Sequence, residues 1–189
     1  MGTRHLTCVV KNGSYKVAQY GQWDGYPSGQ GSDILTFLRS NLDREKFLAN
    51  LERTFVPSDE QIAEMNARLQ AENKGLSDLY PSLSRDTGGG ILQLIQDTSE
   101  PLPLFIKTGF AAESLFCEWA YVVDFDKGTF EVFKGFNKTP LVDTERFYGV
   151  TSEDGADGYQ PVRHLKTYQL NALPTDDEFL AELEPESDD

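Results

Sequence analysis

Apolar and polar residues alternate at the start of the chain. Apolar side chains occupy every second position over residues 6–10, Asn12 and Gly13 follow, and a second alternating run covers residues 14–20. An Asn-Gly pair between two alternating runs is the strongest short-range signal for a β-hairpin. The pattern therefore predicts an antiparallel hairpin over residues 3–20.

A longer apolar run over residues 115–125 predicts a second hairpin. This run is rich in aromatic and β-branched residues, and the turn residues 126–128 precede a return strand at 129–134. Because apolar residues fill both of its faces, we expect the first strand of this pair to lie in the centre of the sheet. Shorter runs predict strands at residues 104–106 and 162–170.

Between these strands, apolar residues recur with helical spacing. Residues 43–53 form one such block, and a glycine-rich stretch at 88–90 leads into another. We expect the helix that ends before Gly75 to lie on the surface, because its apolar stripe is narrow. Side chains suited to N-caps precede three of the predicted helices: Ser32, Ser58 with Gln61, and Thr175 with Glu178.

Together these elements predict an α+β fold. Hairpins separated by helical blocks indicate a mostly antiparallel sheet built from two β-hairpins, with helices packed on one or both faces. A length of 189 residues suits one domain with a sizeable core. We place this domain at residues 1–173, followed by a short helix and an acidic C-terminal tail at 174–189.

Charge narrows the classes of partner. The net charge is −14, and residues 174–189 hold eight acidic residues and no basic one. Because no Lys and Arg cluster is present, we expect no binding of nucleic acid through its phosphates. The chain shows no membrane-spanning apolar run and no signal-peptide core, so we expect a cytoplasmic protein that does not enter membranes.

Cysteine and histidine are scarce. Cys8 and Cys117 lie in apolar runs, which indicates two buried, reduced thiols rather than a disulfide framework. The two histidines, His5 and His164, show no metal-ligand spacing. The sequence thus indicates no metal ion or other cofactor.

The opening Met-Gly-Thr-Arg, the Asn-Gly hairpin and the segment Gln-Tyr-Gly-Gln-Trp-Asp-Gly-Tyr-Pro-Ser-Gly-Gln-Gly carry a resemblance. The chain resembles uncharacterised proteins of phages, bacteria and fungi that share these features. The similarity covers residues 1–31 closely and recurs at residues 84–88 and 117–122. It implies no particular activity.

Residues 19–31 are the strongest candidate for a site, because aromatic, amide and carboxylate groups alternate there with glycines. A second glycine-rich helix start at 85–88 is expected to close this site. Helix N-termini at residues 29–32 and 88–90 would suit an anion such as phosphate, although neither matches a full P-loop or dinucleotide motif. We predict that a small polar or nucleotide-like ligand binds here. The candidate ligand-binding residues are Arg4, Gln19, Tyr20, Gln22, Trp23, Tyr26, Arg85, Asp86 and Thr87.

Two other functions fit the sequence. In a small hydrolase, Asp24 or Glu118 would act as general acid or base, or the opening hairpin would serve an N-terminal-nucleophile mechanism, for which Gly2 has no nucleophilic side chain. An acidic inhibitor that binds a partner protein would suit a phage origin and the acidic tail. The sequence leaves the oligomeric state open.

Structural interpretations compete with each of these roles. Glu118 would form a buried ion pair with Arg4 or Arg85, since an unpaired charge in a central strand is unfavourable. Asp86 would cap a helix, and the amides and carboxylate of residues 19–24 would hold the turn through hydrogen bonds to the backbone. The tight turn at Tyr26-Pro27 is a candidate for a cis peptide bond.

Overall fold

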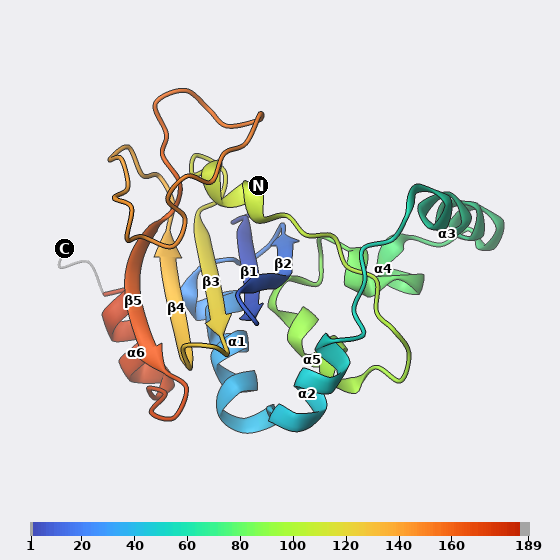
Figure 1. Ribbon diagram of the computed structural model, residues 1–189, viewed down its shortest axis with the longest axis horizontal. Helices are drawn as coiled ribbons and strands as arrows, with labels where there is room; N and C mark the ends of the chain where they lie inside the picture. The colour runs from blue at the N-terminus through green and yellow to red at the C-terminus, as the bar shows by residue number, and fades with distance from the viewer. Residues whose placement is uncertain (1, 186–189) are drawn as a thin grey trace.

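A five-stranded sheet forms the centre of the molecule (Figure 1). The computed structural model describes residues 2–185, so the expected end of the acidic tail at 186–189 lies outside the described residues. The strands follow the order β2-β1-β3-β4-β5. Their bounds are β1 His5–Lys11, β2 Ser14–Gly21, β3 Trp119–Asp124, β4 Thr129–Lys134 and β5 Arg163–Gln169.

Three of the four strand pairs are antiparallel, and β1 runs parallel to β3. The prediction of an α+β fold with a mostly antiparallel sheet is therefore confirmed, and the sheet is mixed. β1 and β2 join through Asn12 and Gly13, which have φ angles of 53° and 73°. Both backbone N–H groups of this turn donate to the Asp126 carboxylate, at 2.9 and 2.8 Å. This contact ties the turn to the next one along the sheet, between β3 and β4.

The first helical region starts earlier than predicted. Pro27 occupies its first turn, and π-helical turns at Pro27–Gly31 and Phe37–Asn41 flank α1. Ser32 is not an N-cap, because it lies inside this region and donates its hydroxyl to the Pro27 carbonyl at 2.9 Å. The helices are α1 Ser32–Thr36, α2 Arg44–Leu51, α3 Asp59–Glu72, α4 Leu76–Leu79, α5 Ile91–Asp97 and α6 Asp176–Leu183.

Capping explains where the other helices start. Ser58 and Gln61 form the expected capping box of α3, and Thr175 and Glu178 form that of α6. Asn73, with a left-handed φ of 51°, ends α3. Figure 1 shows α3 standing away from the sheet, and none of its residues is buried. The prediction of a surface helix is confirmed.

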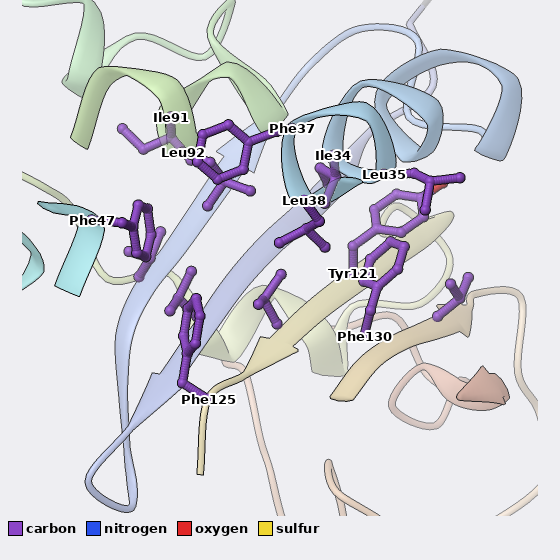
Figure 2. Close-up of a cluster of buried hydrophobic side chains, with 14 of the residues drawn as sticks. Ile34, Leu35, Phe37, Leu38, Phe47, Ile91, Leu92, Tyr121, Phe125 and Phe130 are labelled. Carbon is purple, nitrogen blue, oxygen red and sulfur yellow. The ribbon is translucent and has the colours of Figure 1, made fainter. Parts of the chain in front are cut away.

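One face of the sheet is covered by α1, α2, α5 and α6. Figure 2 shows side chains from the first three of these helices meeting Tyr121, Phe125 and Phe130 of the sheet segment. The rings of Tyr121 and Phe130 stack with centroids 6.3 Å apart. The hydroxyl of the buried Tyr121 donates to the Gly25 carbonyl at 2.7 Å, which fixes the segment after β2 against the centre of the sheet.

The opposite face is covered mainly by connecting segments. Cys8 and Cys117 are buried there as free thiols, as predicted, beside Phe147. Arg146 holds the segment before β5 on the sheet through Asp124 at 2.6 Å and Glu131. Both carboxylates are almost fully buried. The described residues contain no helix that is long and apolar enough to cross a membrane.

Three local predictions are wrong. Residues 115–118 are not part of β3, because the chain turns there before Trp119. Residues 104–106 form no strand: Ile106 makes an isolated bridge with Ala18, and the Leu104 N–H donates to the Phe55 carbonyl at 2.8 Å. Within residues 2–185 no peptide bond is cis, so the expectation for Tyr26-Pro27 is also wrong.

Candidate functional site

A cavity of about 660 Å³ lies at the β2 edge of the sheet. Five segments distant in the sequence form its wall: the start of β1, the end of β2, residues 83–85, residues 105–116 and residues 152–154. Its volume lies within the range typical of small-molecule sites. Its polar, charged and aromatic lining includes Arg4, Gln19, Tyr20, Arg85, Phe105, Lys107, Phe110, Glu113, Phe116 and Asp154.

Three cationic side chains line the cavity: Arg4, Arg85 and Lys107. Within the described part of the chain, none of them forms an ion pair with a carboxylate. Arg4 instead lies over the Phe116 ring at 5.0 Å, and Lys107 lies over Phe105 at 5.6 Å. Glu113 and Asp154 line the same cavity, so its lining carries three positive and two negative charges and is net positive in a chain with a net charge of −14.

Aromatic rings supply the apolar part of the wall. Tyr20 meets the Phe110 ring edge to face, with centroids 4.9 Å apart. Burial raises the pKa of Tyr20 above its usual value, and the Arg4 and Arg85 guanidinium groups oppose this rise. The phenol therefore lies within electrostatic reach of both cations and, at the pH of a cell, stays protonated.

Two carboxylates, those of Glu113 and Asp154, also line the cavity. Glu113 accepts a hydrogen bond from the Ser152 hydroxyl at 2.6 Å, and the same hydroxyl accepts from the Asp154 backbone N–H at 3.2 Å. Asp154 is exposed, and Glu113 is half-buried. The cavity thus combines three cations with two carboxylates, of which Glu113 is bonded to Ser152.

The structure brings the two predicted glycine-rich segments together. Gln22 donates its backbone N–H to the Arg85 carbonyl at 2.9 Å, and the Trp23 indole donates to Asp86 at 2.8 Å. The Gln19 side chain donates to the Ser84 carbonyl at 3.3 Å. These bonds join residues 19–23 to residues 84–86 and fix Arg85 at the cavity.

Behind this junction lies a buried histidine. His5 has no exposed surface, and the Cβ atoms that alanine would carry at Gly21, Gly25 and Gly88 would lie 2.0, 2.6 and 2.9 Å from its side chain. Three glycines therefore allow the imidazole to fill the space between the two segments. Burial lowers the pKa of His5 to about 4, although the Thr3 carbonyl and the Asp24 carboxylate oppose this shift.

Unpartnered polar atoms concentrate at this end of β1. Among the described residues, the buried side-chain nitrogen and oxygen atoms without a hydrogen-bond partner are Arg4 Nε, both ring nitrogens of His5, and Thr7 Oγ1. Such atoms are rare in native proteins, and each one calls for an explanation. Arg4 lines the cavity, whereas His5 and Thr7 point to the helix-covered face of the same strand.

Of the nine candidate ligand-binding residues, four line the cavity: Arg4, Gln19, Tyr20 and Arg85. Gln22 accepts a hydrogen bond from the Tyr20 hydroxyl, and Thr87 donates to the Pro81 carbonyl. Asp86 accepts from Trp23 and Ser77, which lowers its pKa, and it does not cap a helix. These contacts hold the wall of the cavity in place.

The two carboxylates proposed for acid or base chemistry lie outside the cavity. Asp24 is exposed, has a left-handed φ of 53° and accepts a hydrogen bond from Tyr26 at 3.1 Å. Glu118 is half-buried just before β3, and its backbone N–H donates to the Arg4 carbonyl. The predicted ion pair of Glu118 with Arg4 or Arg85 is absent from residues 2–185.

The expected anion sites at helix N-termini are also occupied by the chain itself. The Gly89 N–H donates to the Gln30 side chain at 2.8 Å, and the Gly90 N–H donates to the Thr87 carbonyl at 3.0 Å. Near the other helix start, the Gly29 N–H donates to the Tyr26 carbonyl. These glycine-rich turns therefore join parts of the chain to each other, and their bonded N–H groups are not free for a ligand.

Sequence reasoning missed Lys107, Phe110, Glu113 and Asp154. They lie in segments without motif or periodicity, and only the packing of the chain brings them beside Arg4. Phe116 was assigned to a strand because it begins an apolar run. No protein-family model, curated protein or solved structure matches the chain. The resemblance to uncharacterised phage, bacterial and fungal proteins thus stays a prediction.

Proposed function

We propose that this protein binds a small anionic ligand with a flat apolar part in the cavity beside β2. The observation that carries this proposal is the set of three cations, Arg4, Arg85 and Lys107, which line one cavity without carboxylate partners in the described chain. An anion that enters the cavity gains charge-assisted hydrogen bonds from groups that make none with carboxylates of the chain. The rings of Tyr20 and Phe110 provide an apolar surface for the rest of the ligand.

The proposed ligand is still the small polar molecule expected from the sequence, but its site lies in the cavity beside β2 and no longer in residues 19–31 as a whole. Residues 19–31 contribute Gln19 and Tyr20 to the cavity, and the rest of that segment supports the wall. The hydrolase and the acidic inhibitor remain alternative hypotheses. The contacts of Asp24 and Glu118 give the hydrolase no support, because neither carboxylate faces the cavity.

A matched pair of probes tests the anion. 3-Phenylpropionate carries a ring and a carboxylate, and 3-phenylpropionamide has the same shape without the charge. In isothermal titration we expect the acid to bind at least tenfold more tightly than the amide, since about 1.4 kcal/mol corresponds to a factor of ten. Equal affinities for the two probes would contradict anion recognition.

Charge-neutralising variants test the residues. Arg85→Gln and Lys107→Gln should each weaken binding of 3-phenylpropionate and leave the weak binding of the amide unchanged. Arg53→Gln removes the same charge from an exposed residue just after α2 that does not line the cavity, and is the control. A loss of affinity in Arg53→Gln as large as in Arg85→Gln would mean that net charge alone, and not this cavity, attracts the anion.

A further inference from the structure

The outer edge of β2 is covered at two points near the cavity. The Lys107 N–H donates to the Ala18 carbonyl at 2.9 Å, and the Gln22 N–H donates to the Arg85 carbonyl at 2.9 Å. Tyr20 lies midway between these two contacts. The direction of the Tyr20 N–H and C=O groups therefore decides whether the strand edge presents a free hydrogen-bond donor and acceptor to the cavity.

The register of the sheet gives that direction. In the first strand and just before it, the backbone N–H and C=O groups of even-numbered residues point toward β3. The Arg4 carbonyl accepts from the Glu118 N–H, and the Val10 carbonyl accepts from the Phe125 N–H. The odd-numbered residues of β1 consequently bond to β2, where His5 pairs with Gly21 and Thr7 with Gln19. The backbone N–H and C=O groups of the even-numbered residues of β2 therefore point away from β1, toward the open edge of the sheet.

Tyr20 belongs to this outward set, together with Ala18 and Gln22, whose outward bonds to other segments are observed. Within residues 2–185 no backbone hydrogen bond from another segment reaches the Tyr20 N–H or C=O. Both groups are thus turned to the stretch of edge between Lys107 and Arg85. Because Tyr20, Arg85 and Lys107 all line the cavity, this stretch is part of its wall.

We propose that the ligand of this cavity is an N-acylated α-amino acid with a free carboxylate, the chemistry that also ends a peptide chain. The inference rests on the proposed function and adds the class of ligand. The ligand N–H donates to the Tyr20 carbonyl, and a carboxylate oxygen of the same extended residue accepts from the Tyr20 N–H, as in the addition of a strand to an open sheet edge. The acyl oxygen, on the opposite side of the trans amide, points away from the strand. The carboxylate lies among Arg4, Arg85 and Lys107, and the side chain packs on the rings.

Ligand-side changes test the amide on the unaltered protein. N-acetyl-L-phenylalanine is compared with its ester analogue, O-acetyl-L-3-phenyllactate, in which an oxygen replaces the N–H group, and with 3-phenylpropionate. One net hydrogen bond corresponds to about 3- to 10-fold in affinity, so we expect N-acetylphenylalanine to bind tighter than the ester by about this factor. A five-residue peptide ending in phenylalanine shows whether the amino acid is taken free or at a chain end: tight binding by it indicates a chain end.

Protein-side changes test the partner. Tyr20→Ala and Tyr20→Pro both remove the phenol, and only proline removes the backbone N–H. Since this N–H does not pair within the sheet, proline at this edge position is compatible with the strand. We expect Tyr20→Pro to bind N-acetylphenylalanine more weakly than Tyr20→Ala does, and by a larger factor than for 3-phenylpropionate, which has no N–H group to align its carboxylate with this edge. Thermal melting of each variant checks folding, and the ester comparison replaces this test if Tyr20→Pro does not fold.

The two proposals fail in different ways. If N-acetylphenylalanine, its ester analogue and 3-phenylpropionate bind equally, or if the ester binds as tightly as N-acetylphenylalanine, the inference is overturned and anion binding stands. If none of the carboxylates binds to the folded protein, both proposals are overturned.

Discussion

Buried polar groups lie on both faces of the sheet, and the two sets differ in how they are satisfied. On the face opposite the helices, the Arg146 guanidinium bonds to Asp124 and Glu131, at 2.6 Å for the former, and the Thr129 hydroxyl also donates to Glu131. On the helix-covered face, His5 and Thr7 hold polar atoms that have no partner in the described structure.

The difference separates a scaffold from the surroundings of a site. A closed set of bonds holds one geometry, and it leaves no group for a ligand. Unpartnered polar atoms are unfavourable and persist where the surrounding structure enforces them. In this chain they lie at residues 4, 5 and 7: Arg4 lines the cavity, and His5 and Thr7 point to the helix-covered face behind its wall.

The largest effect should follow from removing the arginine that bonds to the two buried carboxylates. Arg146→Met leaves the carboxylates of Asp124 and Glu131 buried without their cation, so we expect the free energy of unfolding to fall by about 3–5 kcal/mol. Urea denaturation measures it. Arg163→Met, at an exposed arginine lining a shallow cavity with Arg146, is the control and should have little effect. Similar small losses in both variants would remove the distinction between the two regions.

The buried histidine predicts a pH dependence of stability. In the unfolded chain a histidine binds its proton with a pKa near 6.5, whereas His5 in the folded protein does so at about 4. Between these pH values the unfolded state binds more protons than the folded state. The contribution of His5 to the free energy of unfolding is therefore fully present above about pH 6.5, and about 3 kcal/mol of it is lost as the pH falls toward 4.

His5→Gln should remove this slope, because glutamine does not titrate. Unfolding by urea at a series of pH values from 7 to 4 measures the slope, and His164→Gln, at the exposed histidine, should keep it. An unchanged slope in His5→Gln would show that other groups cause the dependence.

The glycines around His5 predict a coupling. In Gly21→Ala the new Cβ would lie 2.0 Å from His5 Cε1, so we expect a loss of about 1–3 kcal/mol from crowding. In a His5→Ala background the same change should be milder, since the ring is gone. At Gly75 the nearest atom to a Cβ is 3.7 Å away, and Gly75→Ala is the control. Equal losses from Gly21→Ala in both backgrounds would mean that the ring does not require this glycine.

The smallest effect is expected at Asp24, which is exposed and outside the cavity. Asp24→Asn keeps a residue type that tolerates the left-handed backbone, so unfolding should change by less than about 0.5 kcal/mol, and binding of 3-phenylpropionate should be unchanged. A loss of binding would return the site to residues 22–26, as the sequence alone suggested.

Local signals in the sequence predicted local structure well. Asn12-Gly13 marked the first turn, and the capping residues Ser58 and Thr175 marked two helices, because these features depend on neighbours along the chain. The parallel pairing of β1 with β3 and the helix start at Pro27 were missed. Strand pairing depends on contacts between distant residues, and glycines inside a helical region hide its start.

The same reasoning applies to the site. Arg4, Tyr20 and Arg85 were found because they lie in motifs, and the structure brings them to one cavity. Lys107 and Glu113 carry no motif, so only the folded chain reveals them. The dense chemistry of residues 22–31 turned out to bond within the chain, which periodicity and spacing do not predict.

The most direct measurement is a map of where 3-phenylpropionate binds, by changes in the backbone amide resonances of the protein on titration. We predict that the largest changes fall on Tyr20, Arg85 and Lys107, and that they disappear in Arg85→Gln. Changes confined to residues 22–31, or to the Arg146 region on the loop-covered face, would contradict a site at the β2 edge.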